Sequence, residues 1–304
     1  MAGAPPSTRL VPSGRHVAGP HGDHALSAIG YGLGSAFVYG IADVAGGVAT
    51  RRAHVLTVLT GAYALGLPLI LIAAILSRTA VPSVDGIAWS VAGGAAEAAA
   101  AGLLYLALAS GTMGVASPLA AVVGAAIPVA VGLLTGETVA PPQALGMVLA
   151  FGTILLIAGP RRVGTAMDRR ATPLAIASGG MFAVSFIAFS TAEATSDPLA
   201  VAAIARVTGL AIVAILAVAI ARPLVAPQGS RRLVGAIGLL DATALVLLLL
   251  AYGSGPLGLT TVLISLYPAV TVVLAGLLLR ERMARSELVG VGIALVAVTL
   301  LAVS

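Results

Sequence analysis

The sequence predicts an all-α integral membrane protein in which ten transmembrane helices form two inverted five-helix repeats. The chain is 59% hydrophobic and only 9% charged, with a mean hydropathy of +1.10, which a water-soluble domain would carry only by exposing large apolar patches. Its apolar residues are grouped in stretches long enough to cross a bilayer as helices. The two halves of the chain also resemble each other, which indicates an internal duplication.

Ten apolar stretches account for most of the chain, because a helix of about 20 residues crosses the hydrocarbon layer. We expect helices at 27–49, 55–76, 86–109, 112–135, 142–159, 173–195, 199–221, 233–252, 256–279 and 286–303. They divide the chain into a tail (1–26), a first repeat (27–159), an Arg-rich linker (160–172) and a second repeat (173–304). The tail is rich in Pro, Gly and Ser without apolar periodicity, so we expect it to be disordered. Its prolines also argue against a secretory signal peptide.

The duplication is clearest in the last part of each copy, where residues 91–159 match residues 235–303 without a gap at an offset of 144. Of these 69 positions 23 are identical, whereas a chain of this composition would match itself at about one position in ten. An odd number of helices per copy makes the second copy insert upside down relative to the first. In the early part of each copy the alignment slips by one residue, which places Gly61 opposite Arg206.

Composition also excludes several classes of function. Cysteine and lysine are both absent, so the chain has no P-loop of the GxxxxGK type and no retinal Schiff base. The four histidines lie in the tail and the first loop (His16, His21, His24 and His54). We therefore expect no haem, no zinc and no other cofactor in the membrane. The arginines lie mostly in loops, which is typical of topology control rather than of nucleic-acid binding.

Two acids lie in the middle of apolar stretches at equivalent positions of the two copies, Glu97 and Asp241. An acid at the bilayer centre costs roughly 2.5 to 3.5 kcal/mol, so it should be paired or face a wet cavity. One interpretation is that both acids bind a proton or a substrate. The other is a structural ion pair, for which Arg206 is the best partner. Because loss of water disfavours the charged form, either acid could load and release protons.

Further residues could line a pathway. Asp43 lies in the second half of its helix and Glu193 near the end of its helix, so both could instead meet water at the membrane interface. Arg206 could anchor an anionic substrate group or pair with one of these acids. Three tyrosines could offer ring faces to a substrate, or could simply pack (Tyr39, Tyr105 and Tyr267). Pro128 and Pro268 interrupt helix hydrogen bonding in equivalent helices, so we expect them to act as hinges.

The ninth stretch ends in Leu277–Arg282 (LLLRER), and the first copy repeats this as Leu133–Glu137 (LLTGE). These and the following short motifs resemble those of the drug/metabolite transporter superfamily and its EamA-like members. The segment Ser265–Pro268 resembles the family's Ser-Leu-x-Pro, and the spacing from Pro198 to Arg206 resembles its Pro-to-Arg spacing. Gly34–Phe37 is similar to the family's opening Gly-Ser-x-Phe, with Leu33 in place of the usual tryptophan.

This resemblance implies ten helices with both termini in the cytoplasm, but the arginines indicate the opposite orientation. Loops on the side away from the termini hold twelve arginines (51, 52, 161, 162, 169, 170, 222, 231, 232, 280, 282 and 285), and the terminal side holds three (9, 15 and 78). By the positive-inside rule the side with twelve arginines faces the cytoplasm.

The duplication, the paired acids and the lack of an ATP-binding motif predict a secondary active transporter. We expect an exporter or exchanger of a small metabolite, amino acid or organic cation, by alternating access and with the acids available for proton coupling. The alternatives are a membrane-embedded enzyme acting on a lipid precursor, which would need a cluster of His, Cys or acids that the chain lacks, and a channel, for which no selectivity ring is visible. We expect a multi-pass protein of the plasma membrane, in a bacterium the inner membrane, whose partners are a small-molecule substrate and membrane lipid.

Overall fold

The computed structural model describes residues 21–110, 113–158, 171–278 and 285–302, and the described residues form helices and turns without a strand. The elements are α1 (His21–Thr50), α2 (Val55–Leu76), α3 (Val84–Ser110), α4 (Met113–Leu134), α5 (Pro141–Ala158), α7 (Ala171–Glu193), α8 (Pro198–Ala219), the 3₁₀ turn η1 (Gln228–Ser230), α9 (Arg231–Ser254), α10 (Leu257–Ile264), α11 (Tyr267–Leu278) and α12 (Arg285–Ala302). Seven helices among these residues are long and apolar enough to cross a membrane, and α5, α10–α11 and α12 provide shorter apolar segments. The chain is thus a multi-pass membrane protein.

Each predicted apolar stretch coincides with helix, with two differences. The helix α1 begins at His21, so residues 21–26 are helical rather than part of a disordered tail. The predicted ninth helix is divided at Ser265 and Leu266 into α10 and α11. Pro268 then lies in the first turn of α11, where its missing N–H costs no helical hydrogen bond. The predictions for residues 1–20 and for Arg161–Arg170 lie outside the described residues.

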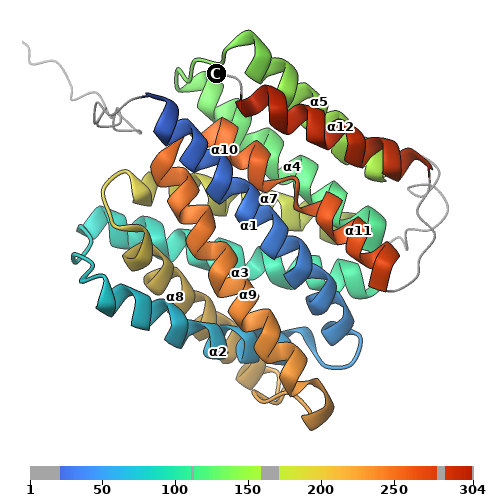
Figure 1. The fold of residues 1–304 in the computed structure, drawn as a ribbon. Coiled ribbons are helices and arrows are strands. Elements are labelled where there is room, and N and C mark those ends of the chain that lie inside the picture. Colours follow the sequence, from blue (N-terminus) through green and yellow to red (C-terminus); the bar gives the residue numbers. More distant parts are fainter. Residues whose placement is uncertain (1–20, 111–112, 159–170, 279–284, 303–304) are drawn as a thin grey trace, which may run out of the picture.

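Helices from the two halves of the chain pack against each other rather than forming separate bundles. The helix α1 lies along α9, α3 along α7, and α5 along α12, while α2 contacts both α8 and α9 (Figure 1). On α2, the outward-facing residues form an apolar stripe at helical spacing (Leu65, Leu69, Ile72 and Leu76). Such a stripe suits contact with lipid.

The contacts between the halves come in reciprocal pairs. The Ser35 hydroxyl donates to the carbonyl of Ala244 over 2.9 Å, and the Ser178 hydroxyl donates to the carbonyl of Ala100 over 2.8 Å. Ala100 and Ala244 are 144 residues apart, the offset found in the sequence, but the two serines are 143 apart (178 − 35).

The caps of α2 and α8 give the same offset of 143. His54 accepts a hydrogen bond from the Leu56 N–H, and Asp197 accepts one from the Leu199 N–H. Burial and the nearby Arg222 lower the pKa of His54, which favours the neutral ring that can accept this bond. The predicted slip in the early part of each copy was therefore in the wrong direction. The counterpart of Arg206 in the structure is Tyr63, not Gly61.

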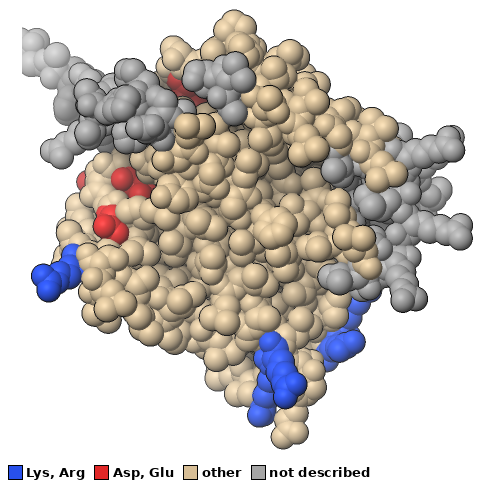
Figure 2. Space-filling model, in the orientation of Figure 1, with Lys and Arg blue, Asp and Glu red and all other residues tan. Residues whose placement is uncertain are grey.

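The exposed charged residues of the described part of the chain lie at the two ends of the bundle. Exposed arginines gather at the end formed by the α1–α2 and α8–α9 connections (Arg51, Arg52, Arg222, Arg231 and Arg232), where the Thr57 hydroxyl donates to the Pro223 carbonyl. The opposite end carries Arg78 with the acids Asp85 and Asp197, both exposed. On the face shown in Figure 2 the charged atoms lie toward the edges, and uncharged surface lies between them.

Adjacent glycines of α7 provide a matched test of helix packing. A methyl group on Gly179 would lie 2.5 Å from the backbone oxygen of Ala120 in α4, whereas one on Gly180 would meet nothing within 4 Å. We expect Gly179→Ala to lower stability by about 1 to 3 kcal/mol because α4 and α7 must separate. Gly180→Ala should be neutral or slightly stabilising, since alanine favours a helix over glycine. Thermal unfolding in detergent measures both, and equal effects would contradict this packing.

The arginine-rich end should face the cytoplasm by the positive-inside rule. The chain has no cysteine, so single cysteines can be introduced directly at exposed positions of the two ends, Gln228→Cys and Thr138→Cys. A membrane-impermeant thiol reagent added outside intact cells should label Thr138→Cys only. Labelling of Gln228→Cys alone would reverse the orientation and agree with the family pattern instead.

Candidate functional site

The two sequence-equivalent acids project from α3 and α9 into the interior, where Glu97 is 5% and Asp241 7% exposed. Each acid follows by three residues a glycine at which helices meet closely. A methyl group on Gly94 would overlap the backbone of Ala205 in α8, and one on Gly238 would overlap the backbone of Ala62 in α2. These close approaches bring α3 against α8 and α9 against α2. Both carboxyls lie within ion-pair distance of one residue of α8, Arg206.

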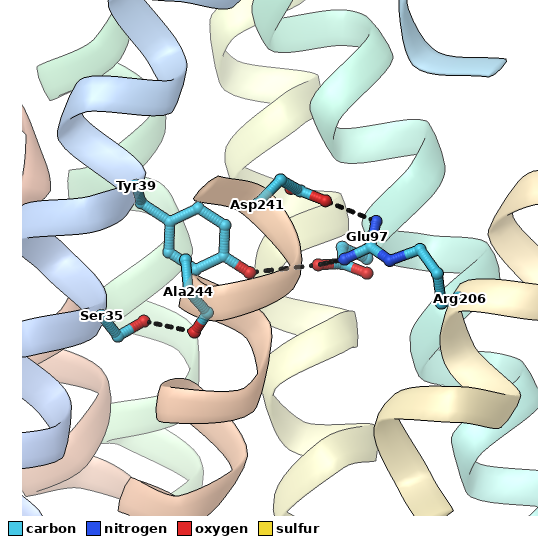
Figure 3. Close-up of polar contacts among 6 residues, drawn as sticks. All are labelled: Ser35, Tyr39, Glu97, Arg206, Asp241 and Ala244. Atoms are coloured by element: carbon cyan, nitrogen blue, oxygen red, sulfur yellow. Dashed lines mark hydrogen bonds and ion pairs between the residues drawn. The ribbon is translucent and has the colours of Figure 1, made fainter. Parts of the chain in front are cut away.

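Arg206 on α8 lies between the two acids (Figure 3). One guanidinium nitrogen, Nη1, is 2.6 Å from Asp241 Oδ2, and Nη2 is 3.7 Å from Glu97 Oε1. Arg206 is only 1% exposed, so it is held far from bulk water. The ion pair expected with Arg206 is therefore present, and it includes both acids rather than one.

Two tyrosines complete the group. The Tyr39 hydroxyl on α1 donates to Glu97 Oε1 over 3.1 Å, as drawn in Figure 3. The guanidinium carbon of Arg206 lies 4.2 Å from the centre of the Tyr63 ring on α2, which is a cation–π contact. Of these two, Tyr39 was predicted and Tyr63 was missed. The matching caps of α2 and α8 place Tyr63 opposite Arg206, and this is the sequence signal that could have identified it.

A polar stripe on α1 continues from this group. Ser35, Tyr39 and Asp43 are spaced four apart and thus share one face of the helix. Asp43 is 5% exposed, and its Oδ2 is buried without a hydrogen-bond partner within the described part of the chain. One turn after Asp43, a methyl group on Gly46 would overlap the ring of Tyr105 on α3, and one turn before it, a methyl group on Gly40 would lie 2.9 Å from the backbone oxygen of Tyr267 on α11. The structure therefore places Asp43, Tyr105 and Tyr267 next to the charged group.

Glu193 is the predicted site residue that the structure places elsewhere. It ends α7, and its carboxyl packs against Gly253 at the far end of α9. One of its oxygens is buried without a hydrogen-bond partner among the described residues. The predicted hinges also differ from each other, because Pro128 lies within the unbroken α4, whereas Pro268 follows the break between α10 and α11.

Sequence reasoning gave no role to Glu137, the glutamate of the LLTGE motif. Its Oε2 accepts a hydrogen bond of 2.9 Å from the backbone N–H of Gly258, in the first turn of α10. A carboxylate at a helix N-terminus satisfies an otherwise unpaired donor and interacts favourably with the helix dipole. Glu137 therefore fastens the start of α10 to the end of α4.

The charges of the buried centre do not balance. Asp43, Glu97 and Asp241 would carry three negative charges against the single positive charge of Arg206, a net charge of −2 when all are ionised. An uncompensated charge in an apolar interior is costly. The centre is therefore suited to taking up cations, either protons or cationic groups of a ligand. The described residues contain no group of three or more His or acidic side chains placed to hold a metal ion.

Residues 170–303 match the EamA-like transporter family, which confirms the predicted resemblance over the second repeat. No curated protein matches the chain. Among the solved structures, one described as "Crystal structure of protein" superimposes with a TM-score of 0.65 at 19% identity, over 92% of this chain and 95% of the other. That likeness shows a shared fold.

Arg206→Gln tests the central ion pair. It leaves two buried acids without a counter-charge, so we expect a loss of stability of about 3 to 5 kcal/mol. In a Glu97→Gln/Asp241→Asn background the same substitution should cost far less, because no carboxylate is left unpaired. Arg232→Gln, at an exposed position of α9, serves as the control. Unfolding in detergent measures the loss of stability for Arg206→Gln and for Arg232→Gln in each of the two backgrounds. Equal losses for Arg206→Gln in both backgrounds would rule out this pairing.

Proposed function

We propose that this chain, whose residues 170–303 match the EamA-like transporter family, is a secondary active transporter that works by alternating access between two inverted five-helix repeats. The observation that carries the proposal is the meeting of Glu97 and Asp241 at Arg206. Equivalent residues of two inverted copies converge near the pseudo-twofold axis, and transporters built from such repeats bind their substrates there.

The reciprocal contacts support the inverted-repeat arrangement. The pair Ser35–Ala244 corresponds to Ser178–Ala100, and the close approach of Gly94 to Ala205 corresponds to that of Gly238 to Ala62. Each contact joins one copy to the other. The two copies could therefore rock against each other about their shared centre while keeping similar internal packing.

The two copies also differ in conformation, as alternating access requires. The helix α4 spans Met113–Leu134 without a break, whereas the segment 144 residues later, Leu257–Leu278, is divided into α10 and α11. In an inverted-repeat transporter the opposite state arises when the copies exchange conformations. The break beside Pro268 is thus the element that should straighten, while α4 bends near Pro128 or Pro118.

The unequal distances at Arg206 suggest how the centre would respond to a ligand. Arg206 lies close to Asp241, at 2.6 Å, and Glu97 is instead bound by the Tyr39 hydroxyl. Glu97 is therefore the acid that can exchange a proton or a cationic group at lower cost. If Glu97 were neutralised, Arg206 would pair with Asp241 alone. The hydrogen bond between Tyr39 of α1 and Glu97 of α3 would also weaken.

Flux measurements in proteoliposomes test this function. The purified protein should carry at least one solute from a panel of amino acids, organic cations and sugars, driven by a proton or solute gradient. Glu97→Gln and Asp241→Asn should each lower the flux by about tenfold or more, the effect of losing a charge-assisted contact of about 1.4 kcal/mol. Asp85→Asn, at an exposed acid in the first turn of α3, should leave it unchanged.

A folded protein that moves no member of the panel under any gradient would overturn the proposal. The proposal would also be overturned if Asp85→Asn lowered the flux as much as Glu97→Gln, because the loss of flux would then not depend on the buried centre.

A further inference from the structure

Of the three acids in the buried centre, Asp43 is the one that forms no ion pair with Arg206. Asp43 lies four residues after Tyr39 on α1, which is about 6 Å along the same helix face. Arg206 already forms ion pairs with Asp241 and Glu97, so its single positive charge cannot also neutralise Asp43. Asp43 is 95% buried, since its exposed fraction is 5%, and its Oδ2 has no hydrogen-bond partner within the described residues.

Aromatic rings flank Asp43 from two other helices. Tyr105 of α3 packs so closely on α1 that a methyl group on Gly46, one turn after Asp43, would overlap its ring. Tyr267 begins α11 and is 6% exposed. It packs in one cluster with Ala36 of α1, and a methyl group on Gly40, one turn before Asp43, would lie 2.9 Å from its backbone oxygen. A carboxylate with aromatic rings on neighbouring helices can bind an ammonium group by charge and by cation–π contact.

The corresponding positions of the second repeat lack this character. With the offset of 143, Tyr39 and Asp43 correspond to Phe182 and Phe186 of α7, whose rings stack with their centres 5.7 Å apart. The Phe186 ring in turn lies 6.3 Å from that of Tyr252 on α9. The same structural element is thus acidic in one copy and aromatic in the other.

From this asymmetry we infer that Asp43 is the anchor for the ammonium group of the transported solute, and that the solute is an amine cation with an apolar, ring-sized body. An anionic solute would add negative charge to a centre that already has more acids than arginines, and a zwitterionic solute would bring a further carboxylate into it. This inference rests on the proposed transport function, and it narrows the solute to one of the classes expected from the sequence.

Three probes of similar shape separate the alternatives: phenethylamine, the neutral 2-phenylethanol and the anionic 3-phenylpropanoate. Thermal shift and calorimetric titration of the purified full-length protein should show that phenethylamine binds at least about tenfold more tightly than either of the others. Tighter binding of the neutral or the anionic probe would overturn the inference. This comparison uses the wild-type protein, so it does not depend on the folding of a variant.

Asp43→Asn should weaken the binding of phenethylamine by about tenfold to a hundredfold. The matched control is Glu193→Gln, since Glu193 is also a largely buried acid without a partner for one oxygen but lies outside the central group. The control should keep its affinity within about twofold. Asp43→Asn should also melt, without ligand, at the same or a higher temperature than the wild type, because it removes an unpaired buried charge. A lowered melting temperature together with unchanged affinity would identify Asp43 as a purely structural residue.

The two proposals fail separately. Flux of an anionic or neutral solute that depends on Glu97 but not on Asp43 would remove the amine site and leave the transporter. Binding of phenethylamine that depends on Asp43, without flux of any solute, would keep the amine site and remove the transport function.

Discussion

The structure depends on one electrostatic constraint: a single arginine must hold buried acids in an interior that offers almost no other charge. An ion pair of this kind is costly to bury, and it is tolerated only where the charges meet closely. Close meeting requires helices that approach without side-chain bulk, and the glycines at 94 and 238 provide this on α3 and α9. The small residues around Glu97 are therefore needed so that α3 can approach α8 closely enough for Glu97 to reach Arg206. The cation–π contact with Tyr63 then holds the guanidinium from its remaining face.

The two copies of the chain are alike where they form the scaffold and different at the buried centre. Serine hydrogen bonds, helix caps and close glycine contacts occur twice, at offsets of 143 or 144 residues. The differences are concentrated at the centre, where Arg206 stands opposite Tyr63 and Asp43 opposite Phe186. In the proposed transport cycle, the symmetric scaffold would let the bundle adopt two equivalent states. The asymmetric centre would suit the proposed solute, an amine cation whose two ends differ.

Much of this could be predicted from the sequence, because lipid imposes simple rules on length and polarity. Helix positions followed from runs of about 20 apolar residues, and the meeting of Glu97 with Asp241 followed from their equivalent positions. The early parts of the repeats were misaligned because matches among small residues are weak signals. The correspondence seen in the structure joins residues of different type with the same role, since His54 and Asp197 both cap the start of a helix. Tyr63 was missed because an aromatic residue in an apolar helix usually only packs. The break before Pro268 was missed because a two-residue interruption leaves the run of apolar residues intact.

The broken helix gives a structural role to Glu137, an acid that lies outside the buried centre. A helix of eight residues such as α10 leaves a large share of its N–H groups without a partner inside the helix. Glu137, from the connection after α4, accepts one of them, so the start of α10 is held by the first copy at the end of the bundle. The following segment is held by α1, because the Thr271 hydroxyl lies within hydrogen-bonding distance, 3.4 Å, of the Gly40 carbonyl. Both pieces of the broken helix are thus attached to the opposite copy, on either side of Tyr267. In the proposed transport cycle, a movement of one copy against the other would therefore act on the break itself, and so on Tyr267, which begins α11.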